Sequence, residues 1–165
     1  MRKRKFFRWL LLSILGTALT SGSASSEPLP FVKGSYRDML RAHAGQPIIV
    51  HIWGLSCGPC LAELPEWGRI AAERPHVKFV LIHADRPDLQ AGKRIGATLA
   101  KMGLGKAESY AFADRFEDRL RFEIDADWQG ELPRSIMIAA NGKATTLAGV
   151  ADMAAVRAWM DATAK

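Results

Sequence analysis

Residues 48–65, which read IIVHIWGLSCGPCLAELP, decide the fold of this chain. The segment 48–53 is a short apolar run rich in β-branched residues, and it predicts a buried strand. A helix is predicted to follow over about 57–73. Both cysteines of the chain, Cys57 and Cys60, therefore fall where a buried strand gives way to a helix.

Outward from this segment, the chain predicts further alternating helices and strands. Ser35 resembles the first residue of a capping box, and Asp152 is predicted to cap the last helix. The remaining helices are predicted over 35–44, 87–102 and 115–122, and the remaining strands over 77–83, 109–113, 134–140 and 143–147. The Asn141-Gly142 turn makes the last two strands a hairpin, and a helical crossover makes 77–83 parallel to 48–53.

The Cys57-Gly58-Pro59-Cys60 motif has the spacing of a redox pair. Free N–H groups and the positive dipole end of the helix favour a thiolate at Cys57. The arrangement suits thiol–disulfide exchange, in which Cys57 attacks a substrate disulfide and Cys60 resolves the mixed disulfide. A purely structural disulfide would close a four-residue loop and stabilise little. The chain has no second cysteine pair for a zinc site, although His51, His76 and His83 remain as candidate ligands.

These residues resemble the thioredoxin superfamily, and within it the exported TlpA/ResA-like thiol–disulfide oxidoreductases. The segment 48–65 is similar to that family's strand, redox motif and first helix. Residues 132–135, which read LPRS and precede IMIAANGK, are similar to its cis-proline loop and late hairpin. The resemblance covers about 35–165 and implies an α/β thioredoxin fold, with a central mixed β-sheet flanked by helices on both faces.

The resemblance also implies roles for residues around the cysteines. Pro133 would be the cis-proline that faces them, and the backbone of Leu132 would pair with a bound substrate strand. Glu63 lies one helix turn after Cys60, where the family's glutamate is thought to aid proton transfer. An exposed helix glutamate without such a role is the alternative.

His51 lies six residues before Cys57, where thioredoxins carry a buried acid. A neutral imidazole beneath Cys60 could accept the proton of that thiol, and a core histidine without a catalytic role is the alternative. Trp53 matches the first tryptophan of the family motif. We predict that it binds substrate together with Leu132, Pro133 and Arg134. Arg134 departs from the family pattern, and it either steers an acidic partner, favours the Cys57 thiolate, or is a solvated surface residue.

The net charge of +6 is almost entirely an N-terminal feature. Residues 1–24 hold five basic and no acidic residues, and 25–165 hold 18 basic against 17 acidic residues. A basic stretch, an apolar run of about eleven residues and a small polar tail have the layout of a signal peptide, cleaved after Ala24. An uncleaved anchor is the alternative, and nucleic-acid binding is disfavoured. An extended leader over 25–34 and a thioredoxin-like domain over 35–165 are predicted to follow.

The sequence therefore predicts an exported, for example periplasmic, reductase of protein disulfides that needs no cofactor and no metal. The expected partners are protein disulfide substrates and a membrane thiol–disulfide electron donor, and the membrane itself only if the anchor is uncleaved. Two alternatives stay open: a client-specific reductase for apocytochrome c or copper-site maturation, and a thiol-based metal chaperone.

Overall fold

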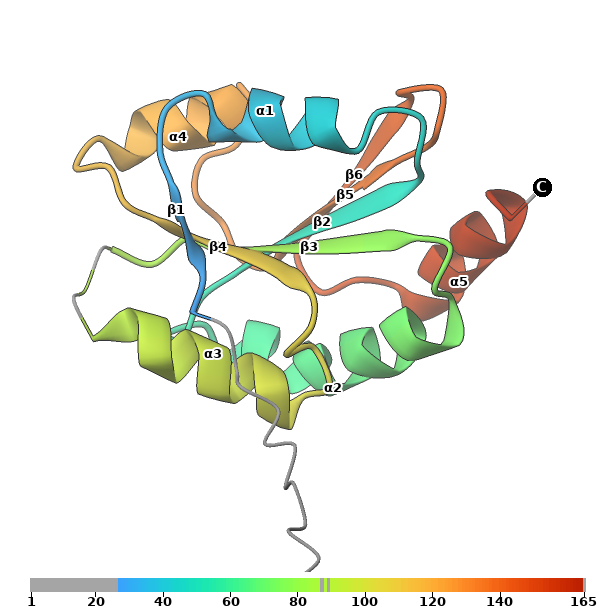
Figure 1. The fold of residues 1–165 in the computed structure, drawn as a ribbon, viewed down its shortest axis with the longest axis horizontal. Helices are drawn as coiled ribbons and strands as arrows, with labels where there is room; N and C mark the ends of the chain where they lie inside the picture. Colours follow the sequence, from blue (N-terminus) through green and yellow to red (C-terminus); the bar gives the residue numbers. More distant parts are fainter. Residues whose placement is uncertain (1–26, 87, 89, 165) are drawn as a thin grey trace, which may run out of the picture.

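A six-stranded sheet with helices on both faces forms the protein (Figure 1). The structure, a computed structural model, describes residues 27–86, 88 and 90–164, so the predicted signal peptide lies outside the described residues. The strands are β1 Leu29–Phe31, β2 Ile48–Trp53, β3 Lys78–His83, β4 Glu108–Phe112, β5 Arg134–Ile138 and β6 Ala144–Ala148. The helices are α1 Ser35–Ala42, α2 Gly58–Glu73, α3 Ala91–Lys101, α4 Glu117–Ile124 and α5 Met153–Ala162.

The strand order is β1-β4-β3-β2-β5-β6, which places β2 inside the sheet. All six residues of β2 are buried because strands flank it on both sides and helices cover both faces. β2 runs parallel to β3 and antiparallel to β5, so the sheet is mixed. The predicted α/β fold with a central mixed sheet flanked on both faces is confirmed.

Alternation along the strands divides the core into two layers. Ile49 and Trp53 of β2 point into the layer formed with α2, α3 and α5. Ile48, Val50 and Ile52 point into the layer formed with α1 and α4. Figure 1 shows these two groups of helices on opposite sides of the sheet.

The helix ends follow the predicted signals only in part. Asp152 caps α5 as expected, because its side chain accepts hydrogen bonds from the N–H groups of Ala154 and Ala155. Ser35 is not the cap of α1, so the capping-box prediction is wrong. Gly34 holds that position with a positive φ, and the Ser35 hydroxyl accepts a bond from the Val32 N–H instead.

The predicted extended leader contains a strand of the sheet. β1 pairs in parallel with β4 at the sheet edge. Phe31 is fully buried and stacks on Phe112, with ring centroids 5.5 Å apart. The folded domain therefore begins before residue 35.

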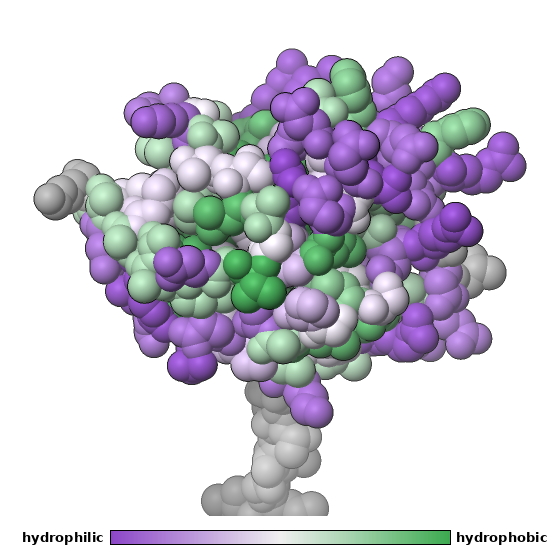
Figure 2. All heavy atoms as spheres, turned by 180° about the vertical axis from the view of Figure 1, so that it is seen from behind, coloured by the Kyte–Doolittle hydropathy of each residue, from purple (hydrophilic) through white to green (hydrophobic). Residues whose placement is uncertain are grey.

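The surface opposite the view of Figure 1 is uneven in polarity. Hydrophilic side chains gather along its upper side, and apolar and weakly polar residues cover its centre (Figure 2). Within the described ranges, every helix is too short or too polar to cross a lipid bilayer.

Candidate active site

The two cysteines lie at the start of α2 and form a disulfide. Cys57 is the N-cap residue of the helix, and the backbone N–H of Cys60 donates a hydrogen bond to its Sγ at 3.2 Å. Cys57 is partly exposed, whereas Cys60 is fully buried. In the reduced state, Cys57 is therefore the sulfur that a protein substrate can reach, and the helix N-terminus favours its thiolate.

The loop that enters the motif is fastened to the end of β3. The backbone N–H and the hydroxyl of Ser56 donate to the carboxylate of Asp85 at 3.0 and 2.8 Å. The Leu55 N–H donates to His83 Nε2 at 3.3 Å. A Cβ at Gly54 would lie 2.2 Å from Asp85 Oδ1, so the carboxylate packs where a larger residue would stand.

Sequence reasoning missed Asp85, and it considered His83 only as a candidate zinc ligand. The signal that could have found them is their position at the carboxyl end of β3, which is parallel to and adjacent to β2. Loops that leave neighbouring parallel strands at the same edge lie side by side.

The loop before β5 lies beside the cysteine loop. The Leu132–Pro133 peptide bond is cis. Arg134, the first residue of β5, pairs in register with Ile52 near the end of β2. Pro133 therefore lies at the end of β2 from which the cysteine loop departs. Leu132 is partly buried and packs against both core layers.

Arg134 has a different setting from any that the sequence suggested. Its guanidinium is buried and forms ion pairs with Asp125 and Glu131. The Arg134 bond lowers the pKa of Asp125. The two carboxylates thus neutralise the guanidinium. By alternation along β5, the Arg134 side chain lies on the sheet face covered by α1 and α4, whereas Cys60 lies on the face covered by α2. Arg134 ties this loop to the end of α4, and its charge is not free to attract an acidic partner.

Trp53 also differs from its expected role in substrate binding. It is fully buried, in the same apolar layer as Cys60. Its ring packs edge-on against His83, with centroids 5.3 Å apart. Trp53 therefore supports the cysteine loop from beneath and offers no surface to a substrate.

Glu63 is buried rather than an exposed helix glutamate. Its Oε2 accepts a hydrogen bond from the Ala151 N–H at 3.0 Å. Its Oε1 lies 3.5 Å from His51 Nε2. Burial raises the pKa of Glu63 because the apolar layer disfavours its charged form.

His51 is fully buried on the same face of the sheet. Its Nδ1 lies 2.9 Å from the hydroxyl of Ser135, and its ring packs on Trp67 with centroids 5.0 Å apart. Burial lowers the pKa of His51 to about 3. The imidazole is therefore neutral at physiological pH, and it is a weak acceptor of a full proton.

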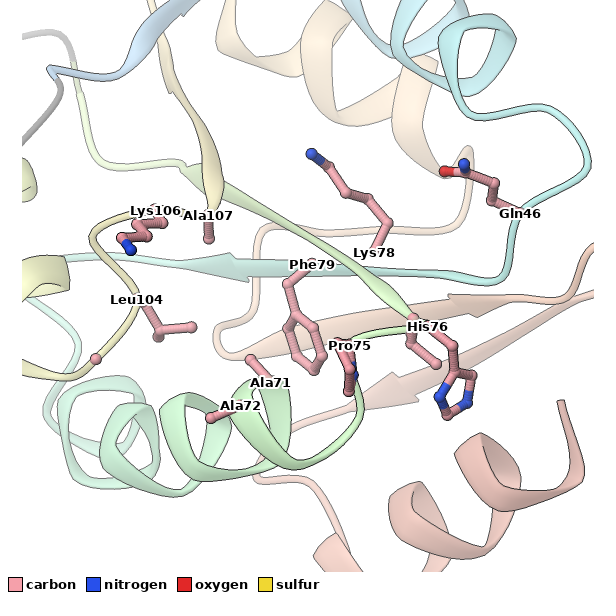
Figure 3. A pocket seen from close by; sticks show the side chains of 12 residues that line it. Gln46, Ala71, Ala72, Pro75, His76, Lys78, Phe79, Leu104, Lys106 and Ala107 are labelled. Carbon is pink, nitrogen blue, oxygen red and sulfur yellow. The ribbon is translucent and has the colours of Figure 1, made fainter. Parts of the chain in front are cut away.

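A pocket of about 620 Å³ lies at the other end of α2 (Figure 3). Ala71 and Ala72 of that helix, Phe79 of β3, and Leu104 contribute to its wall. None of the predicted catalytic or substrate-binding residues lines it, and of the candidate zinc ligands only His76 does. The chemistry of the chain is concentrated at the N-terminus of α2 instead.

Comparisons with known proteins agree with this fold. Neither a protein-family model nor a curated protein matches the sequence. A secreted disulfide oxidoreductase of Mycobacterium tuberculosis, homologous to E. coli DsbE, superposes with a TM-score of 0.60 at 22% identity, over 74% of this chain and 85% of that chain. A thioredoxin-family thiol:disulfide interchange protein of Chlorobium tepidum gives 0.59 at 20% identity, over 75% and 83%. StoA of Bacillus subtilis gives 0.54 at 20% identity, over 70% and 83%.

Identities of this size establish the fold and not the activity. The chain has the thioredoxin fold that its sequence predicted, and its cysteine pair lies at the start of the helix that follows the central strand.

Proposed function

We propose that this thioredoxin-fold chain is an exported thiol–disulfide oxidoreductase that reduces protein disulfides through Cys57 and Cys60. One observation carries the proposal: a partly exposed Cys57 at a helix N-terminus is bonded to a fully buried Cys60. The same asymmetry separates an attacking sulfur from a resolving sulfur. The three similar structures, described as disulfide oxidoreductase, thiol:disulfide interchange protein and StoA, are consistent with it.

In the first step, the Cys57 thiolate of the reduced protein attacks one sulfur of a substrate disulfide. A bond forms between Cys57 Sγ and that sulfur, and the other substrate sulfur leaves as a thiolate. The N–H groups at the start of α2 stabilise the attacking thiolate. In the loop before β5, the backbone of Leu132 next to the cis-proline Pro133 pairs with the bound substrate strand.

In the second step, the Cys60 thiol gives its proton to the Glu63 carboxylate. The resulting thiolate attacks Cys57 Sγ, which forms the Cys57–Cys60 disulfide and releases the second substrate sulfur as a thiolate. Two electrons thus pass from the protein dithiol to the substrate disulfide. Burial raises the pKa of Glu63, which brings it closer to the pKa of a thiol. The carboxylate is therefore a better base toward Cys60.

The direction of reduction is proposed from the Gly-Pro dipeptide between the cysteines, which resembles that of reducing thioredoxins. The layout of residues 1–24 supports export, and an exported reductase in an oxidising compartment needs a source of electrons. A membrane donor of the thiol–disulfide class would restore the dithiol. The substrates are protein disulfides.

The test measures reduction of insulin disulfides by the mature chain with dithiothreitol as the electron source. We expect the wild type to accelerate the reaction and Cys57→Ser to be inactive. In a separate trapping experiment without dithiothreitol, we expect Cys60→Ala to accumulate a mixed disulfide because the resolving sulfur is missing, and mass spectrometry identifies the bound protein. His76→Asn, far from the cysteines at the pocket of Figure 3, is the control with wild-type activity.

A reduced protein that binds metal but does not reduce insulin would be a metal chaperone. Stoichiometric, tight binding of copper(I) or zinc to the reduced protein, without insulin reduction, contradicts the proposed enzyme.

A further inference from the structure

We propose that His51, held by Ser135, accepts a hydrogen bond from protonated Glu63, so that Glu63 stores the Cys60 proton and His51 is a positioning residue. This inference rests on the proposed function and deepens it. It assigns different tasks to Glu63 and His51, which the sequence alone offered separately as candidates for proton transfer.

The contacts form a chain across three elements. Ser135 on β5 meets Nδ1 of His51 on β2 at 2.9 Å. His51 Nε2 then lies 3.5 Å from Glu63 Oε1 on α2. Within the described part of the chain, Nε2 and Oε1 are both buried and no hydrogen bond is made to either atom. The Trp67 indole N–H also faces the Glu63 carboxyl, and it favours the charged form of Glu63 against the effect of burial. The second oxygen of Glu63 is already engaged by the Ala151 N–H.

Proton counting leaves two arrangements for this chain. A neutral imidazole carries one N–H. If Nδ1–H donates to the Ser135 oxygen, the Nε2 lone pair faces Glu63 and can accept only from a protonated carboxyl. If Nε2 carries the proton, it donates to an ionised Glu63, and the Ser135 hydroxyl donates to Nδ1.

Burial favours the first arrangement. It leaves both groups neutral in a layer that is otherwise apolar. The second leaves a buried carboxylate whose other donors, the Ala151 N–H and the Trp67 indole, carry no charge, and burial outweighs them. The raised pKa of Glu63 and the lowered pKa of His51 agree with this choice.

The surroundings supply no competing charge. Residues of α3 and α5 that pack in this layer are apolar. From α2 and its N-cap, Glu63 and the two cysteines face this layer. The other charged residues of α2 form ion pairs elsewhere: Glu66 with Arg69 and Arg157, and Glu73 with Arg157. At the end of β3, burial lowers the pKa of His83, whose nearest carboxylate is Asp85. Arg134, the buried cation next to Ser135 in sequence, points into the opposite layer.

The arrangement has a consequence for exchange. A bond to Nε2 stabilises the protonated carboxyl, and stabilising the neutral form raises the pKa of Glu63. During substrate reduction, the proton moves from Cys60 Sγ to Glu63 Oε1 and is held against Nε2. When an external dithiol reduces the disulfide again, the same proton returns from Glu63 to the Cys60 thiolate. His51 keeps its own N–H throughout.

The first test reads the His51 tautomer directly in the oxidised wild-type protein by ¹⁵N NMR. We expect a protonated Nδ1 and an unprotonated Nε2 at pH values where Glu63 is protonated. A protonated Nε2 under those conditions would overturn the proposal. Since this measurement requires neither substrate nor turnover, its failure is separate from a failure of the proposed enzyme.

The second test follows the Glu63 carboxyl by ¹³C NMR in variants of the oxidised protein. We expect His51→Phe to lower the Glu63 pKa by about half to one unit, since one hydrogen bond to the neutral form is lost. Ser135→Ala is expected to shift it in the same direction, because Nδ1–H loses its fixed acceptor. His76→Asn is the matched control with an unchanged titration.

A rise of the Glu63 pKa in His51→Phe would show that Nε2 donates to the carboxylate, and an unchanged pKa would show that the two groups are uncoupled. Either result overturns the proposal. If His51→Phe does not fold, Ser135→Ala and the wild-type tautomer still decide it.

Discussion

Single buried residues make the stability of this protein depend on pH, and His51 is the strongest case. Its pKa is about 3 in the folded protein, against an ordinary value of 6.5. Between these values the unfolded chain binds the extra proton, so stability falls as pH falls through this window, by about 1.4 kcal/mol per pH unit. We expect His51→Asn to lose this part of the acid sensitivity in urea unfolding measured from pH 7 to pH 4.

Glu63 acts in the opposite sense, which sets the design of that measurement. Its folded pKa is raised above 4.5, so its ionisation destabilises the folded protein as pH rises past that value. The comparison is therefore made between Glu63→Gln and Glu63→Gln with His51→Asn. Parallel stability curves for these two proteins would contradict the assigned role of His51 in acid sensitivity.

The residues that sequence identified well are those whose chemistry depends on neighbours in the chain. Cys57 and Cys60 required only their own spacing and the strand–helix boundary. Arg134 could not be assigned, because its partner Asp125 belongs to the end of another helix. The burial of Glu63 likewise depends on Ala151, 88 residues further on, which sequence alone does not place beside it.

At the scale of elements, Gly68 tests the packing of α2 against the end of α3, and Gly92 is its control. A Cβ at Gly68 of α2 would lie 1.9 Å from the backbone oxygen of Met102, the C-cap of α3. At Gly92 of α3, the nearest atom would be Glu27 Oε2 at 3.6 Å, an ordinary contact. Helix propensity alone favours alanine at both positions, by up to about 1 kcal/mol.

We expect the structure to reverse that sign at Gly68 only. Gly68→Ala should destabilise the oxidised protein by about 1–3 kcal/mol, because backbone must move to admit the methyl group. Gly92→Ala should be neutral or stabilising by up to about 1 kcal/mol. Urea unfolding of both variants checks this, and equal stability changes would show that α2 and α3 are not in the described contact.

The elements themselves were predictable where local signals were strong. β2 has the predicted bounds, and α2 begins one residue after the predicted Cys57. α3 begins at Ala91 rather than 87, and its N-cap residue Gln90 makes no side-chain capping bond. The Asp88 carboxylate accepts a hydrogen bond from the Gln90 N–H instead, just before the helix, and sequence alone does not place this contact.

At the scale of the whole molecule, the missed strand β1 shows what local patterns cannot supply. It has three residues, and Pro30 within it removes one backbone N–H. Such a segment forms a strand only because it pairs with β4, which lies about 80 residues further along the sequence. An edge position tolerates the proline, since one side of the strand needs no partner.

The contribution of β1 to the whole fold should be measurable through one side chain. Phe31 is fully buried between the sheet and the layer of α1 and α4, in contact with Tyr110 and Phe112. Phe31→Ala should therefore destabilise the protein by about 3–5 kcal/mol in urea unfolding. Leu29→Ala is the matched control in the same strand, because Leu29 is 54% exposed and its loss should change stability by less than about 0.5 kcal/mol. Equal, small effects for the two variants would mean that β1 is an appended leader, and the folded domain would then begin at residue 35 after all.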